Sequence, residues 1–201
     1  MKRFRILCLS ALTLCILASH TSAAGLIHTV VRGDTMWKVA SKYEVGTREV
    51  IDANTQIKNP DLIYPGDRLN IPQLSSSVLN VERQVISLVN EIRVQNGLSA
   101  LTENWQLSRV ARYKSQDMAD LGYFSHNSPT YGTPFQMMKQ FGITYRSAGE
   151  NIANGYSTAQ AVVNAWMNSP GHRANILNAS YSQIGVGYVA RGNHWTQMFI
   201  G

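Results

Sequence analysis

A short polar stretch divides the sequence into two parts whose hydrophobic patterns differ. This stretch, QLSSSV, lies in a linker that we place at residues 73–79. Residues 28–72 before it combine short β-rich runs with two helical patterns. Residues 80–201 after it carry longer amphipathic helices and end in an alternating hairpin. We therefore predict an α+β protein of two domains, joined by a linker too short to separate them widely.

The N-terminus has the three-part pattern of a secretory signal peptide. Lys2, Arg3 and Arg5 precede an apolar run, and the small residues of HTSAAG follow it. We assign residues 1–24 to this signal. The apolar run is too short to cross a bilayer comfortably, and no later segment has the length to do so. The pattern predicts a protein that is secreted, either extracellular or associated with the cell wall, without a transmembrane segment.

Removal of the signal peptide changes both the cysteine content and the charge. Cys8 and Cys15 lie within it, so the mature chain has no cysteine and relies on its core. That is typical of a bacterial surface protein rather than a small disulfide-stapled secretion. The formal charge falls from +6 to +3, with 15 basic and 12 acidic residues remaining. So small and scattered an excess argues against nucleic-acid binding.

Residues 28–72 are predicted to form a strand, two helices and a second strand. The run at 28–31 favours β structure, and Asp34 or Thr35 can cap the helix that follows. Thr47 can cap the second helix, and the turn YPGD leads into a closing strand at 68–71. Apolar residues at helical spacing are expected to face a core, and we place Trp37 in that core as well.

Residues 28–72 closely resemble a LysM domain. The motifs that carry the resemblance are VVRGDTMWKVA, IDANT and NPDLIYPGDRLNIP, in that order. The resemblance implies binding of peptidoglycan or another N-acetylglucosamine-containing glycan in a groove between two loops. A neutral sugar polymer suits such a shallow groove with backbone hydrogen bonds and an apolar face. Carried over to this chain, the groove residues are Gly33, Asp34, Thr35 and Met36 on one side and Ile63, Tyr64, Pro65 and Gly66 on the other.

Residues 80–201 are predicted to form helices around a small antiparallel sheet. One amphipathic helix follows the linker and ends near Gly97, and a second is expected to start at a Thr102 cap and end at Gly122. Short helices are predicted at 134–140 and after Thr158. The final segment alternates as a hairpin whose two-residue turn is Gly192 and Asn193. Together these elements predict a sandwich.

Four ordered blocks in this unit resemble a CAP domain, the superfamily of cysteine-rich secretory, antigen 5 and pathogenesis-related 1 proteins. They are YFSHNSP, AGENIA, VVNAWMNSPGHRANIL and IGVGYVARGNHWTQMF. The resemblance implies an α-β-α sandwich with two histidines and two glutamates in a central cleft. Three of these four residues are present: His126, Glu150 and His172. The second glutamate is missing, because Met167, Asn168 and Ser169 stand where it is expected.

These three side chains permit more than one kind of site. Two imidazoles and a carboxylate can hold a divalent cation such as zinc, with His126 and His172 as ligands, or can position a water without a metal. Each residue also has a purely structural explanation, as a helix-end contact, a loop acceptor or a member of a helix's first turn. We expect the ordered set to converge in one cleft, with His194 exposed to solvent or on a sheet face, and Trp105, Trp166 and Trp195 in the core or at its rim.

Two functions compete on this basis. The favoured hypothesis is a wall-associated protein that binds peptidoglycan through LysM and uses the CAP domain for binding or as a scaffold, without turnover. The sequence has no GxSxG and no mature cysteine that could act as a nucleophile. The alternative is a metal-assisted hydrolase that acts on wall peptide, glycan or surface protein through His126, Glu150 and His172. Nothing in this chain points to lipid carriage, a third role known in CAP relatives.

Overall fold

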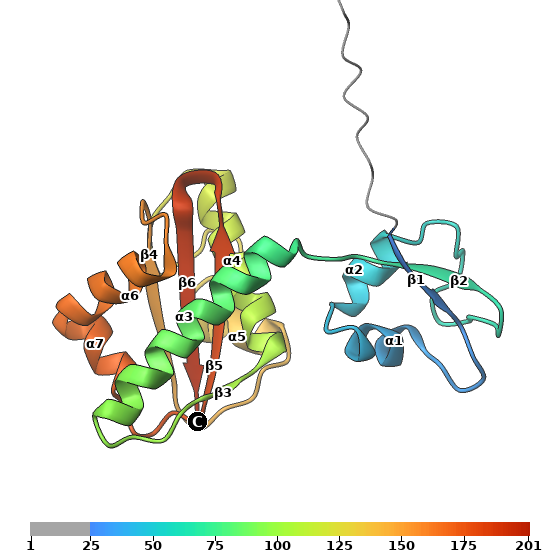
Figure 1. Cartoon of the computed structure of the whole chain (residues 1–201). Helices are drawn as coiled ribbons and strands as arrows, with labels where there is room; N and C mark the ends of the chain where they lie inside the picture. The colour runs from blue at the N-terminus through green and yellow to red at the C-terminus, as the bar shows by residue number, and fades with distance from the viewer. Residues whose placement is uncertain (1–24) are drawn as a thin grey trace, which may run out of the picture.

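The computed structural model describes residues 25–201, which form two α+β units (Figure 1). The predicted signal peptide lies outside the described residues. None of the helices in 25–201 has the length and hydropathy that a bilayer crossing requires.

The N-terminal unit has the predicted β-α-α-β order. Strand β1 (Leu26–Thr29) pairs antiparallel with β2 (Arg68–Ile71), and two short helices follow β1, α1 (Met36–Lys42) and α2 (Thr47–Asp52). Its core consists of buried residues from α1, α2, β2 and the connecting segments: Val30, Met36, Val39, Ala40, Val45, Val50, Leu69 and Ile71. The first strand begins two residues earlier than the sequence predicts.

Helix α1 begins at one of the predicted N-caps, but one residue predicted to lie in the core is exposed. The Thr35 side chain accepts from the Lys38 N–H, so Thr35 is the N-cap. Trp37 does not belong to the core, because 63% of it is exposed. It follows Met36, which faces inward, and one step along a helix turns the next side chain by about 100° away from the buried face.

The C-terminal unit contains a four-stranded mixed sheet in the order β3-β5-β6-β4. Antiparallel β5 and β6 lie at its centre, and β4 forms one edge against β6. In chain order its elements are α3 (Ser76–Gln95), β3 (Thr102–Glu103), α4 (Trp105–Leu121), α5 (Pro134–Gln140), β4 (Ala148–Ala153), α6 (Ala159–Asn168), α7 (Pro170–Ile176), β5 (Gln183–Val189), the 3₁₀ turn η1 (Arg191–Asn193) and β6 (His194–Ile200).

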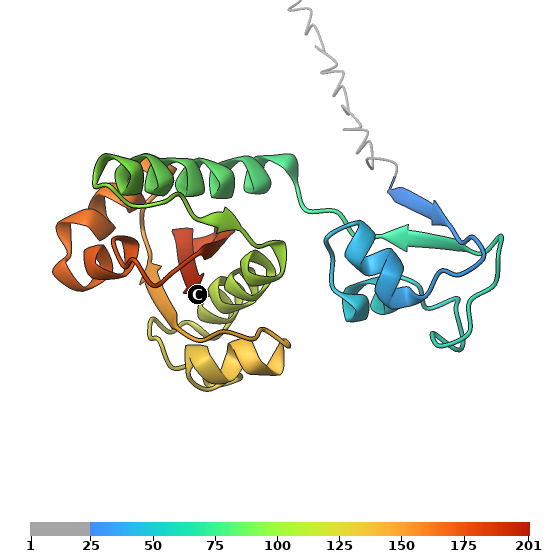
Figure 2. The ribbon, with the colours of Figure 1, turned by 90° about the horizontal axis from the view of Figure 1, so that it is seen from below.

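Helices cover both faces of this sheet, which gives the predicted α-β-α sandwich (Figure 2). Helices α3, α6 and α7 bury one core, in which Trp166, Trp195 and Phe199 are the large side chains. Helices α4 and α5 bury the other, which is rich in methionine: Met137, Met138 and Met198. Successive residues of β6 serve opposite cores because strand side chains alternate between faces.

Two glycines of β5 let helix α4 approach the sheet very closely. A Cβ at Gly185 would lie 2.3 Å from the Ser108 nitrogen, and a Cβ at Gly187 would lie 2.1 Å from the Arg112 nitrogen. Both neighbours are main-chain atoms that cannot move aside. The backbone of α4 is therefore fixed against the sheet, and the side chains that α4 carries have defined positions relative to the strands.

The structure also differs from the sequence prediction at several boundaries. Helix α3 begins at Ser76, so the end of the segment expected as linker is helical. Thr102 lies in β3, and Asn104 caps α4 instead. The expected two-residue hairpin is a longer connection through η1. Residues 148–153, which we read as a loop, form the edge strand β4.

The two units contact each other through helices α2 and α4. Glu49 accepts hydrogen bonds from Arg109 Nε at 2.6 Å and from the Tyr113 hydroxyl at 2.7 Å. Arg109 also lies over the rings of Tyr113 and Phe141. A cavity of about 450 Å³ lies beside this contact, and residues of both units line it.

Candidate functional site

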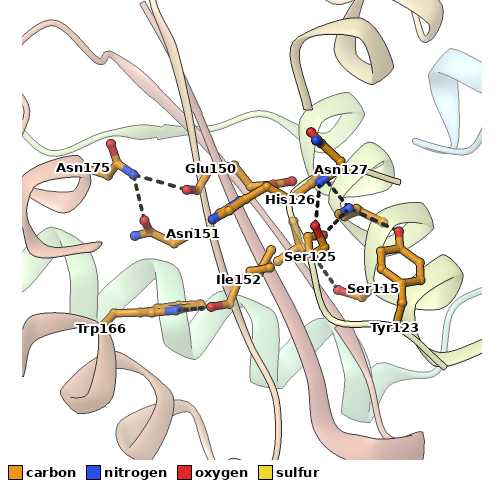
Figure 3. A network of polar contacts seen from close by, with 12 residues as sticks. Ser115, Tyr123, Ser125, His126, Asn127, Glu150, Asn151, Ile152, Trp166 and Asn175 are labelled. Carbon is orange, nitrogen blue, oxygen red and sulfur yellow. Dashed lines mark hydrogen bonds and ion pairs between the residues drawn. The ribbon is translucent and has the colours of Figure 1, made fainter. Parts of the chain in front are cut away.

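Edge strand β4 places Glu150 against the loop that follows helix α4. Glu150 pairs with Met198 of β6 and is only 7% exposed. His126 lies in the loop, and its Nδ1 is 2.7 Å from Glu150 Oε1 (Figure 3). When Glu150 is ionised it can only accept, so a neutral His126 directs its Nδ1–H toward Glu150 and its Nε2 remains an acceptor. The structure thus brings two of the three predicted cleft residues into direct contact.

Glu150 is an unusual carboxyl because one of its oxygens has no protein partner. Burial raises its pKa, while the hydrogen bond from His126 and the charges of Lys114 and His126 act in the opposite direction. Within residues 25–201, Oε2 is buried and receives no hydrogen bond. Buried polar atoms are normally paired, so Oε2 is the atom of this pair that remains free, among the described residues, to accept a further hydrogen bond.

The third predicted residue, His172, lies in the first turn of α7 and is partly exposed. Its main-chain carbonyl accepts from Asn151 Nδ2. Asn175 donates to the carbonyl of Glu150 and to Asn151 Oδ1 (Figure 3). These bonds attach α7 to strand β4. Burial, and then the charge of His126, lower the pKa of the His172 imidazole. His172 is therefore close enough to sense His126 electrostatically, and its neutral form is favoured.

The donor set does not fit a metal centre. Across the part of the chain that the structure describes, no cluster of three or more His, Cys, Asp and Glu side chains has the arrangement to hold an ion. Met167, Asn168 and Ser169, which stand where the second glutamate is expected, supply no carboxylate. A structural or catalytic zinc takes at least three protein ligands. The cation expected from His126 and His172 thus lacks a complete coordination sphere.

A small hollow lies beside His172, between β4 and α6, and neither His126 nor Glu150 lines it. Its volume is about 280 Å³, and its exposed rim includes Phe124, which is 50% exposed, and Tyr156, which is 39% exposed. Ile152 and Trp166 form part of its lining, and the Trp166 indole donates to the Ile152 carbonyl. This apolar surface was not predicted from the sequence, although Phe124 lies within the motif YFSHNSP and Tyr156 follows shortly after AGENIA.

The other aromatic and histidine residues follow the sequence prediction in part. Trp166 and Trp195 are fully buried core residues, and Trp105 is partly exposed. His194 opens strand β6 and is also partly exposed. Its Nδ1 is nevertheless buried without a hydrogen-bond partner among residues 25–201.

In the N-terminal unit, a second hollow lies between the loop before α1 and the loop before β2. Its volume is about 290 Å³. Of the eight predicted groove residues, Asp34, Thr35, Met36 and Ile63 line it, whereas Gly33, Tyr64, Pro65 and Gly66 do not. The sequence analysis missed the remaining lining residues, which are Trp37, Thr47, Ile51, Pro60, Asp61 and Leu62.

Asp34 holds the first of these loops in place. Its Oδ2 accepts from the Val31 N–H at 2.9 Å and contacts His28 Nε2 at the same distance. The backbone bond from Val31, and next the His28 contact, keep the pKa of Asp34 below its ordinary value. Asp34 therefore orders the loop, a different role from the helix cap that Thr35 supplies.

Comparison with known proteins agrees with both units. The model of the Cysteine-rich secretory protein family, CAP, matches residues 86–200, and that of the LysM domain matches residues 28–72. YkwD of Bacillus subtilis (strain 168) is 58% identical over 126 residues, which are 63% of this chain and 49% of that protein. The membrane protein YlbC of the same organism is 35% identical over 74% of this chain and 44% of its own length.

A solved structure supports the same assignment. An extracellular protein with an SCP domain from Bacillus anthracis is 35% identical, with a TM-score of 0.60 over 68% of this chain and 47% of that one. The chain thus spans about half the length of the relatives that it matches. With the CAP model covering more than half of the sequence, and the sandwich and its His126–Glu150 pair in place, the chain belongs to the CAP family and carries a LysM domain ahead of its CAP domain.

Proposed function

We propose that the protein is secreted and binds peptidoglycan through its LysM domain, which holds the CAP domain at the cell wall. The observation that carries this proposal is the hollow between the two LysM loops, with an exposed tryptophan at its side and polar loop backbone around it. An apolar ring surface beside polar loop groups suits a neutral N-acetylated sugar, which has an apolar ring face and amide groups.

The test is sedimentation of the protein with purified peptidoglycan. We expect the protein to pellet with the wall and soluble N-acetylglucosamine oligomers to release it. A chain without residues 28–72 serves as the control and should remain in the supernatant. If this control pelleted as well as the intact chain, the CAP domain would be the anchor and the proposed division of roles would be wrong.

For the CAP domain we propose a binding or scaffold role at the cleft of His126, Glu150 and His172. The cleft offers an acceptor nitrogen on His126, a carboxyl with an unpaired oxygen, and an apolar hollow beside His172. These groups are suited to recognition of a ligand that has both a hydrogen-bond donor and a small apolar part. No step of this proposal uses a metal ion, because the donor set lacks the ligands for one.

One observation favours hydrolysis as a second candidate. A buried carboxyl with a raised pKa, hydrogen-bonded to a histidine, is a typical general acid–base arrangement. We would incubate purified walls with the protein and analyse the released fragments. Reproducible cleavage that is lost in Glu150→Gln would establish catalysis. Absence of any released fragment from wild type would leave the binding role as the function of the cleft.

A further inference from the structure

A lysine ammonium lies buried beneath the loop that carries His126. Lys114 belongs to α4, and its solvent exposure is 0%. Its Nζ donates to the carbonyls of Ser125 at 2.7 Å and His126 at 2.8 Å, and to the Tyr123 hydroxyl at 3.2 Å. The three donors of an ammonium are thus all used, which is the condition for burying it without a large penalty.

A carboxylate one turn further along α4 binds the same loop. Asp117 Oδ2 accepts from the Tyr123 hydroxyl at 2.5 Å and from the Ser128 hydroxyl at 2.7 Å, and Oδ1 accepts from the Thr130 hydroxyl at 2.5 Å. Burial opposes the ionised form, but these three bonds keep the pKa of Asp117 below its ordinary value. Residues 123–130 are therefore held from below by one cation and one anion of α4.

This arrangement connects the position of His126 to the sheet. Helix α4 is fixed against β5 at Gly185 and Gly187, and Glu150 is fixed by the pairing of β4 with β6. The His126 imidazole itself is 53% exposed, so core packing does not hold its ring. Two groups set its position: the carboxyl of Glu150 at Nδ1, and Lys114 through the main chain.

We propose that Lys114 is a positioning residue of the cleft, which holds the main chain at His126 so that its Nδ1–H meets Glu150 and its Nε2 faces the ligand. The inference rests on the proposed role of this cleft as the binding site of the CAP domain. Without the ammonium, the carbonyls of Ser125 and His126 lose their shared donor and the loop can rotate. The imidazole then loses its fixed partner and exchanges between its two tautomers.

The chain provides a matched control in Arg93, a second buried cation that holds main-chain carbonyls. Arg93 is 1% exposed and donates to the carbonyls of Ser99, Ile176, Asn178 and Tyr181. It holds the end of α7 and the chain that follows it, and none of these hydrogen bonds goes to residues 123–130. Loss of Arg93 should destabilise the fold at least as strongly as loss of Lys114, because it leaves four main-chain carbonyls without their donor, whereas loss of Lys114 leaves two.

The experiment is nitrogen NMR of the histidine rings in the full chain, with melting temperatures measured in parallel. Wild type should show His126 as a single tautomer with the proton on Nδ1. In Lys114→Met, the two ring-nitrogen signals of His126 should shift toward a common averaged value. Tyr123→Phe keeps both carbonyl bonds of Lys114 and should retain the wild-type signals, as should Arg93→Met despite its lower melting temperature.

Two results would overturn the proposal. The first is a folded Lys114→Met with unchanged His126 signals. The second is an equal change in Arg93→Met, which would make the effect one of general destabilisation. If Lys114→Met does not fold, Lys114→Gln replaces it, and unchanged signals there count equally against the proposal. Wall sedimentation of these variants should match wild type, so a failure of the LysM proposal would be recognised separately.

Discussion

The exposed tryptophan of the LysM domain permits a quantitative test of glycan binding. Trp37 lines the hollow between the two loops and is 63% exposed, so replacement by alanine removes contact surface without opening the core. A tryptophan buries roughly 150–250 Å² when fully covered, so about 130 Å² remains available on Trp37. A sugar ring that covers about half of this surface contributes about 1.6 kcal/mol at ~25 cal/mol per Å².

This free energy corresponds to a weakening of wall binding by roughly 15-fold in Trp37→Ala. The assay is a binding isotherm from sedimentation with increasing amounts of purified peptidoglycan. Because exposed substitutions change stability by less than about 0.5 kcal/mol, the melting temperature should fall by no more than about 3 °C. A loss of affinity together with a large loss of stability would therefore not count in favour of the prediction.

Tyr64 provides the matched comparison. It is 58% exposed and was predicted from the family resemblance to belong to the groove, but it does not line the hollow. We expect Tyr64→Ala to bind the wall as wild type does. If Tyr64→Ala lost affinity while Trp37→Ala retained it, the sugar would bind elsewhere on the domain and the reasoning from the hollow would be refuted.

Two further predictions concern packing and the contact between the domains. Gly187→Ala should destabilise the CAP domain by about 2 kcal/mol or more, because the added Cβ meets the backbone of α4. An unchanged midpoint of denaturant-induced unfolding would contradict this prediction. Burial alone would raise the pKa of Glu49, but bonds from the Gly46 N–H, Arg109 and Tyr113 lower it. Because the pKa of Glu49 is lowered, the contact is fully stabilised at pH values above the ordinary glutamate pKa near 4.3. This stabilisation is lost as the pH falls through the lowered pKa of Glu49. X-ray scattering of the wild-type protein should therefore show a larger radius of gyration in acid than at pH 7. The Glu49→Gln variant should already have the larger radius at pH 7. Equal radii for both proteins at both pH values would exclude a role for the Glu49–Arg109 ion pair.

Local patterns predicted most of the helices because their signals lie in neighbouring residues. The helix at 134–140 was predicted with its observed bounds, since Thr133 caps it and Pro134 occupies its first position. The cap at Thr158 and the left-handed Gly122 after α4 were likewise visible in the sequence. The order of elements and the sandwich followed from these patterns together with the family resemblance.

Features that depend on distant contacts were not predictable in this way. Strand β4 contains alanine, glycine, glutamate and asparagine, which are poor strand formers, and its pairing with β6 overrides their preference. Trp37 was misplaced because hydrophobicity alone does not show on which side of a short helix a residue lies. The burial of the Lys114 ammonium beneath the His126 loop was also not predicted, since helical spacing does not show whether the ammonium of a lysine lies in water or in the core.

Helix α4 carries both the two charged residues that hold the His126 loop, Lys114 and Asp117, and the two side chains that touch the LysM domain, Arg109 and Tyr113. An insertion of a single residue between Arg109 and Lys114 would rotate everything beyond it by about 100°. The side chains that hold the His126 loop and those that contact the LysM domain could then not both keep their positions. Chimeras that exchange LysM or CAP modules among relatives should for this reason take the helix as one intact piece, with crossover points placed in the loops on either side of it.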